Sequence, residues 1–147
     1  MRISIIAVGK IKEPSLRACI DEYAARIKRY ADYEEHEIKE SQAKRILENF
    51  RKRIPKNATT IALEVHGQHQ NSTQFSQWLQ KHADHGTRDI AFLIGGAYGL
   101  DPIISQEAQL KLSLSQMTLP HRLCRLVLVE QIYRAFSLAK GEPYAHE

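Results

Sequence analysis

The sequence predicts an α/β protein whose parallel sheet is covered by helices on both faces. Three observations support this fold class: short apolar runs rich in β-branched residues recur along the chain, a helical pattern follows most of them, and Gly or Pro stands at most of the changeovers. A chain of 147 residues buries one core and leaves little room for a second. We therefore expect a single domain that spans residues 1–147.

Two strands and two helices are expected before residue 56. Residues 3–8, ISIIAV, are apolar and end at a glycine, which is typical of a buried strand. Pro14 begins a helix, because the N–H that proline lacks is not needed in the first turn. Residues 33–38 form a weaker strand at the edge of the sheet. Ser41 can cap the second helix, which Pro55 ends.

Two further strands follow in the middle of the chain. Residues 59–65, TTIALEV, form the third strand, and the next helix starts within residues 71–73. Residues 89–94, DIAFLI, form the fourth strand and lead directly into a glycine-rich loop. Asp101 caps a helix that has Pro102 in its first position.

The C-terminal region contains the most apolar helix of the chain. Residues 112–119 alternate between apolar and polar side chains and predict a strand or an extended loop, and a long helix follows from about 121 to 140. This helix has two apolar stripes, of which one is Leu126, Val129, Tyr133 and Phe136 and the other is Leu128, Ile132 and Ala135. A helix with two apolar faces is buried on both of them. We expect one face to pack on the sheet and the other on a partner subunit, in a homodimer.

Positive charge is concentrated in the first part of the chain. The formal net charge is +4, and residues 1–56 hold 14 of the 21 Lys and Arg residues but only 9 of the 17 acidic residues. Clusters such as Arg51–Lys56 can lie against RNA phosphates, although a solvated helix face explains them as well. No apolar run approaches the roughly 18 residues that span a bilayer. Because Cys19 and Cys124 have no metal or redox spacing, we expect a reduced cytoplasmic protein.

The segment FLIGGAYGLDP, residues 92–102, raises the question of a ligand site. Ligands of open α/β sheets bind at the carboxyl ends of the strands, and glycines there let a ligand approach the backbone. A tight turn that needs positive φ explains the same glycines. The chain contains no P-loop motif, and the spacing of Gly95, Gly96 and Gly99 does not match the dinucleotide fingerprint. A phosphate-binding role for the loop is therefore not favoured.

Neither a metal site nor a covalent nucleophile is predicted. Two pairs of histidines have the spacing H-x-x-H, His66 with His69 and His82 with His85. No cysteine or H-E-x-x-H motif accompanies them, so solvated surface histidines explain them better than zinc ligands. The chain also lacks the G-x-S-x-G motif of a serine nucleophile.

Five segments, taken together and in this order, resemble a known family. They are IIAVGK, LEVHG, FLIGGAYGL, LSLSQMTLPH and VEQIYRAF, and they resemble the RlmH (YbeA-type) family of SPOUT methyltransferases over essentially the whole chain. The resemblance implies a Rossmann-like sheet with a C-terminal trefoil knot, which is a rare exception to unknotted topology. It also implies a homodimer that transfers a methyl group from S-adenosylmethionine to N3 of a pseudouridine in 23S rRNA within the ribosome. The alternative is a non-catalytic RNA-binding or ribosome-binding protein on the same fold.

The resemblance further implies where the cofactor binds. The expected cofactor-binding residues are Leu63, Gly95, Leu114, Ser115, Gln116, Met117, Thr118 and Leu119. Glycine lets backbone groups reach the edges of adenine, and the leucine and methionine side chains supply the apolar walls that such pockets have. Plain core packing explains Met117 and Leu119 as well.

The C-terminal tail supplies the candidate catalytic residues. Tyr144 and His146 are expected near the site, where one of them takes the N3 proton or contacts RNA. The match is imperfect, because Ala145 stands where the family has histidine and His146 comes one residue later. The residues that could hold an RNA phosphate or the cofactor carboxylate are His121, Arg125 and Arg134.

Overall fold

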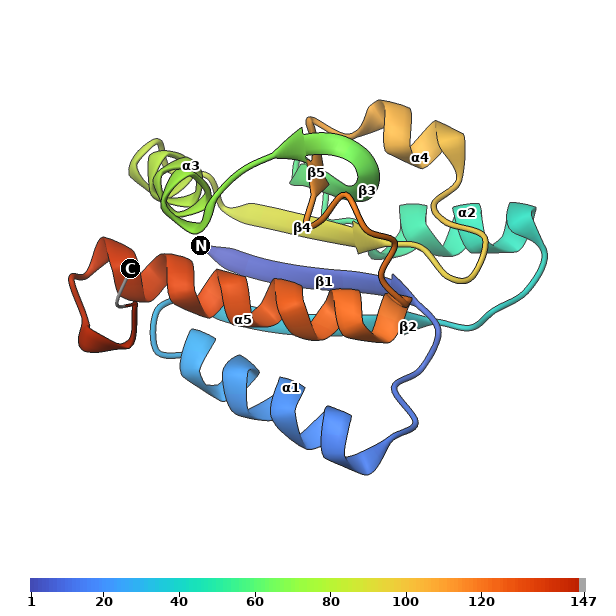
Figure 1. Cartoon of the computed structure of the whole chain (residues 1–147). Helices are drawn as coiled ribbons and strands as arrows, with labels where there is room; N and C mark the ends of the chain where they lie inside the picture. The colour runs from blue at the N-terminus through green and yellow to red at the C-terminus, as the bar shows by residue number, and fades with distance from the viewer. Residues whose placement is uncertain (146–147) are drawn as a thin grey trace.

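The computed structural model describes residues 1–145, and the strands of that part of the chain form one parallel sheet in the order β2-β1-β4-β3-β5 (Figure 1). The strands are β1 (Arg2–Val8), β2 (Asp32–Ile38), β3 (Thr59–His69), β4 (Asp89–Ile94) and β5 (Leu110–Ser113). The helices are α1 (Pro14–Ile27), α2 (Ala43–Arg53), α3 (Ser72–Asp84), α4 (Pro102–Glu107) and α5 (His121–Ala139), followed by a 3₁₀ turn, η1 (Pro143–Ala145). The predicted α/β class with a parallel sheet is confirmed.

Helices cover both faces of the sheet, as the sequence predicts. Successive strand residues point to opposite faces. In β1, Ile3 and Ile5 therefore join a core that includes side chains of α1, α3 and α5, whereas Ile6 and Val8 join a second core with α2 and α4. The continuous apolar runs of β1 and β4 follow from this burial on two sides.

Helix α5 is buried within the chain on both of its apolar stripes. It packs on the sheet side by side with α1 and against α3, whose Ser76 hydroxyl donates to the Ala135 carbonyl at 2.6 Å (Figure 1). Leu128 on one stripe and Val129 on the other are both 0% exposed. The expectation that a partner subunit covers the second stripe is therefore wrong, because α1 and α3 already supply that cover. The homodimer itself stays a prediction.

Two local details differ from the sequence prediction. Gln42, not Ser41, precedes the first turn of α2, and it makes no side-chain capping bond. Strand β3 does not end at residue 65 but bulges outward and returns, so that Leu112 of β5 is paired with both Leu63 and Gln68. We call residues 64–67 the β3 arch. The strand pairing leaves the predicted trefoil knot untested.

Glycine is required where the β3 arch closes onto β5. A Cβ atom added at Gly67 would lie 2.7 Å from the backbone carbonyl of Lys111, which is closer than atoms pack in proteins. The absence of a side chain thus lets the arch return to the sheet. The arch forms one wall of the pocket described next.

Candidate active site

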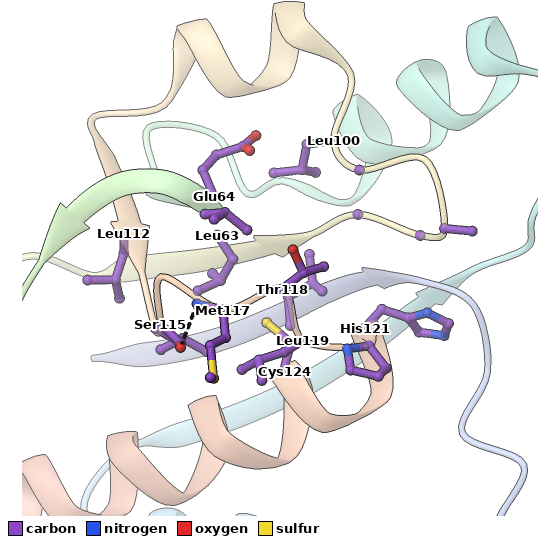
Figure 2. Close-up of a pocket in the computed structure, with 18 residues that line it drawn as sticks. Leu63, Glu64, Leu100, Leu112, Ser115, Met117, Thr118, Leu119, His121 and Cys124 are labelled. Carbon is purple, nitrogen blue, oxygen red and sulfur yellow. Dashed lines mark hydrogen bonds between the residues drawn. The ribbon is translucent and has the colours of Figure 1, made fainter.

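A pocket of about 540 Å³ lies at the carboxyl edge of the sheet (Figure 2). Its walls are the β3 arch, the loop after β4 and the segment that joins β5 to α5. Seven of the eight residues predicted to bind the cofactor line it: Leu63, Gly95, Leu114, Ser115, Met117, Thr118 and Leu119. Gln116 is exposed and does not line the pocket. The volume lies within the range of about 300–1,000 Å³ that is usual for small-molecule sites.

The segment Ser115–Leu119 offers unpaired backbone groups. The Ser113 hydroxyl donates to the Ser115 carbonyl at 2.9 Å. The Met117 N–H donates to the Ser115 hydroxyl at 3.0 Å (Figure 2). Within residues 1–145, these are the only protein partners of the backbone N–H and C=O groups of this segment. Backbone groups of this kind are strong donors and acceptors that seek partners. They can therefore bind the polar edges of a heterocycle.

The glycines of the loop after β4 serve the shape of the loop itself. A Cβ atom at Gly95 would lie 2.3 Å from the carbonyl carbon of Gly99 and 2.4 Å from the nitrogen of Leu100. Gly99 has a φ of +77° and donates its N–H to the Gly96 carbonyl at 3.0 Å. The tight-turn interpretation is therefore correct for Gly99. Gly95 is small because the returning backbone of its own loop passes over it, and this folded loop forms the pocket wall.

Glu64 and Cys124 are among the lining residues that were not predicted from the sequence, whereas His121, a candidate for holding an RNA phosphate or the cofactor carboxylate, does line the pocket. Glu64 is the one acidic residue among the described residues that line the pocket. Cys124 and His121 line it from the first turns of α5. Burial raises the pKa of the Cys124 thiol to about 11, so this thiol stays protonated near neutral pH. Cys124 is a wall of the pocket and not a nucleophile.

Arg125 fixes the first turns of α5 to the ends of β1 and β2. The side chain is 1% exposed and donates from Nη1 to Glu37 Oε2 at 2.6 Å and from Nη2 to the Gly9 carbonyl at 2.9 Å. The Ile11 N–H donates to the same Glu37 oxygen at 3.0 Å. Burial opposes ionisation of Glu37, but the hydrogen bonds from Arg125 and Ile11 outweigh it and hold the pKa of this carboxyl below its usual range. The guanidinium is thus engaged inside the protein, and the expected role in holding RNA or cofactor is not supported.

Tyr144 does not reach the pocket of its own chain. Its hydroxyl donates to Glu130 Oε1 at 2.8 Å, and its ring packs on Tyr133 with centroids 4.6 Å apart. Glu130 follows Cys124 by six residues, which places it about 9 Å further along α5 and about 120° around the helix axis. Burial and hydrogen bonds to Tyr23 and Glu130 raise the pKa of the Tyr144 phenol. The other predicted catalytic residue, His146, lies outside the described residues.

The described residues, 1–145, contain neither a potential metal cluster nor a membrane-spanning helix. In this range no three or more His, Cys, Asp or Glu side chains gather as a potential metal site. No helix in the same range is long and apolar enough to cross a membrane.

The fold and the pocket define an α/β protein that binds a small molecule at the carboxyl edge of a parallel sheet. The chain belongs to the SPOUT methyltransferase family, because the family profile described as "Predicted SPOUT methyltransferase" matches residues 1–146. The resemblance found in the sequence is thereby confirmed.

Individual relatives agree with this assignment. The chain is 44% identical to "Ribosomal RNA large subunit methyltransferase H" of Sorangium cellulosum, over 99% of this chain and 100% of that protein. It is 40% identical to the protein of the same name in Bacillus pumilus, over 98% and 99%. Among solved structures, it is similar in fold to a probable methyltransferase from Bordetella pertussis Tohama I, with a TM-score of 0.55 and 10% identity over 91% of this chain and 95% of that chain.

Proposed function

We propose that this protein is an S-adenosylmethionine-dependent methyltransferase that acts on large-subunit ribosomal RNA, with N3 of a pseudouridine as the methylated atom. The observation that carries the proposal is the convergence of seven predicted residues, from three separate parts of the sequence, on one pocket. Family membership and the names of the relatives support the same activity. A ribosomal substrate also implies a cytoplasmic location, and a single domain spanning residues 1–147 is part of the proposal.

The residues of the pocket fit S-adenosylmethionine. Leu63, Leu114 and Leu119 supply apolar walls for the adenosine, and the unpaired backbone groups of Ser115–Leu119 supply donors and acceptors for the adenine edge. The molecule contains no phosphate, so a P-loop is not needed. Glu64 offers a negative charge to a ligand that carries a sulfonium and an ammonium group. Bound there, S-adenosylmethionine supplies an electrophilic methyl group.

The task of the protein is then to position the RNA and remove one proton. The N3 nitrogen has to lie in line with the S–CH₃ bond, and such positioning accounts for a large part of the rate of a two-reactant step. As the N3–CH₃ bond forms, the N3 proton has to pass to water or to a side chain. The phenol of Tyr144 is protonated near neutral pH, since its pKa is raised further above an already high ordinary value, and it is suited to donate a hydrogen bond.

A homodimer is part of the proposal. Leu123 and Val127, one turn apart on α5, are 40% and 38% exposed, and Met117 in the adjacent loop is 76% exposed. These three exposed apolar side chains lie on the N-terminal half of α5 or in the loop before it, and they offer a contact for a second copy of the chain. A second copy also gives the tail a route to a pocket, because Tyr144 is held away from the pocket of its own chain. Sedimentation of the protein at micromolar concentration tests the dimer.

The proposed activity is tested with two measurements on the purified protein. Calorimetry with S-adenosylmethionine should show stoichiometric binding. Incubation with labelled cofactor and unmethylated large subunits, free 23S rRNA or whole ribosomes should label the RNA, and mass spectrometry of the nucleosides should show N3-methylpseudouridine. Ribosome binding without cofactor binding would instead establish the non-catalytic alternative.

A further inference from the structure

A second pocket, of about 800 Å³, adjoins the cofactor pocket at the carboxyl ends of β1 and β2. Its lining includes Lys10 and Lys12 after β1, Lys39 after β2, and His121 and Arg122 at the start of α5. His121 lines both pockets. The imidazole lies over Gly9, where an added Cβ atom would be 3.2 Å from His121 Nε2. The two pockets are therefore neighbours that share one side chain.

Two of the three acidic residues that line this second pocket, Glu13 and Glu37, pair with arginines. Glu37 binds Arg125 and the Ile11 N–H, and Glu13 forms an ion pair with Arg122 at 3.4 Å. Glu40 lies close to Gly96, where its Oε2 would be 2.6 Å from an added Cβ atom.

The lysines of the second pocket are available to a ligand. Within the described part of the chain, Lys10, Lys12 and Lys39 form no ion pair or hydrogen bond through their ammonium groups. All three side chains are exposed. Three ammonium groups around a cavity of this size fit a ligand with several negative charges.

The Arg51–Arg53 cluster, the densest basic run of the sequence, lies in the last turn of α2 and lines neither pocket. Helix α2 joins the carboxyl end of β2 to the amino end of β3, and both strands are parallel members of one sheet. In Figure 1, α2 lies beside the carboxyl end of β4, and residues 54–58 lead from it to the start of β3. Arg51 is engaged there with Glu107 of α4 at 3.0 Å. Methyl transfer needs the RNA at the carboxyl edge, beside the cofactor pocket.

We propose that Lys10, Lys12 and Lys39 bind the phosphate backbone of the substrate RNA next to the target nucleotide, so that the base passes His121 into the cofactor pocket. This proposal rests on the proposed function. Lysine suits the role, since its ammonium is a compact point charge that binds phosphate without reading sequence. The second pocket has no aromatic side chain other than His121 among its described lining residues. Its chemistry therefore favours phosphates over stacked bases.

The test compares two triple variants that remove the same number of positive charges. One is Lys10→Gln with Lys12→Gln and Lys39→Gln, and the control is Arg51→Gln with Lys52→Gln and Arg53→Gln. The probe is the isolated large ribosomal subunit, with binding measured across a salt series and methylation measured as kcat and KM. Calorimetry with S-adenosylmethionine and the thermal midpoint are recorded for both variants.

The lysine variant should bind subunits at least tenfold more weakly, with KM raised and kcat at saturation retained. The slope of log affinity against log salt should fall by about 2, because each lost phosphate contact on single-stranded RNA removes about 0.7. The control should bind like the wild type, and cofactor affinity should be unchanged in both. Equal losses in both variants, a loss only in the control, or no loss in either would overturn the proposal.

Two further readouts keep the outcomes distinct. If the lysine triple variant has a lowered thermal midpoint, the single variant Lys39→Gln is used, and it should still flatten the salt slope by about 0.7. If the wild-type protein binds the cofactor but methylates no ribosomal RNA, the proposed function fails, which differs from a failure of the lysine site in an active enzyme.

Discussion

Replacement of Gly95 by alanine should weaken cofactor binding through the shape of the loop. The added Cβ atom would lie 2.3–2.6 Å from three backbone atoms of Gly99 and Leu100, where contacting carbon atoms normally stay about 3.5–4.0 Å apart. The backbone of the returning loop therefore has to move by roughly 1 Å. Gly99 and Leu100 line the cofactor pocket, so a shift of their backbone changes the shape of the pocket.

The expected magnitude follows from the cost of overpacking. Extra atoms forced into a well-packed site cost about 1–3 kcal/mol. If the loop keeps its shape only in the bound state, that cost falls on binding and lowers the affinity for S-adenosylmethionine roughly tenfold to hundredfold. Titration calorimetry measures the affinity, and thermal unfolding reports the part of the cost that falls on the free protein.

Gly86→Ala is the matched control. Gly86 has a φ of +76° and no atom within 4 Å of an added Cβ, so alanine there is strained but touches nothing. It should destabilise the fold by about 1 kcal/mol or slightly more and leave cofactor affinity unchanged. A folded Gly95→Ala protein with an affinity within twofold of the wild type would refute the account of the loop.

Three other predictions concern the helix, the buried carboxylate and the tail. Leu128→Glu should lower the free energy of unfolding, measured by urea denaturation, by more than about 3 kcal/mol, because it places an unpaired charge in a core position. A cooperatively folded monomer would contradict this and would indicate that Leu128 only holds subunits together. Because the pKa of Glu37 is lowered in the folded state, its contribution to stability is present above the unfolded pKa and is lost as pH falls through the folded pKa. The stability difference between wild type and Glu37→Gln should therefore shrink between about pH 6 and pH 3, whereas a constant difference would show that the pair with Arg125 is not the cause. If the tail of one subunit serves the pocket of the other, a mixture of Tyr144→Phe and Gly95→Ala subunits should methylate faster than either variant alone at a cofactor concentration too low to saturate Gly95→Ala. No gain on mixing would limit Tyr144 to packing.

The order and type of the elements could be predicted because the local signals are strong. The structure shows the predicted apolar runs of β1 and β4, the cap Asp101 with Pro102, and the start of α3 within residues 71–73. What covers a given helix face is a tertiary property, and no local pattern encodes it. For this reason the two stripes of α5 indicated a partner subunit, although α1 and α3 cover them.

The site was predictable only in part. The glycine spacing left a turn and a ligand site equally open, and the resemblance to a family, not the pattern, pointed to Leu63 and to residues 114–119. Glu64 was missed because strict alternation along a strand places it on the face opposite Leu63, and the β3 arch breaks that alternation. Arg125 looked like an RNA contact because a buried arginine cannot be distinguished from an exposed one without its acceptors.

The two walls of the cofactor pocket formed by α5 and by Ser115–Leu119 are held to the rest of the fold in different ways. The bonds of Arg125 to Glu37 and to the Gly9 carbonyl tie the first turns of α5 to two strands, so Cys124 and His121 move only with the sheet. The opposite wall, Ser115–Leu119, is held by two serine hydroxyls. We therefore expect the adenosine to enter and leave past this short segment, and the residence time of the cofactor to depend on those two hydroxyls more than on any residue of the helix.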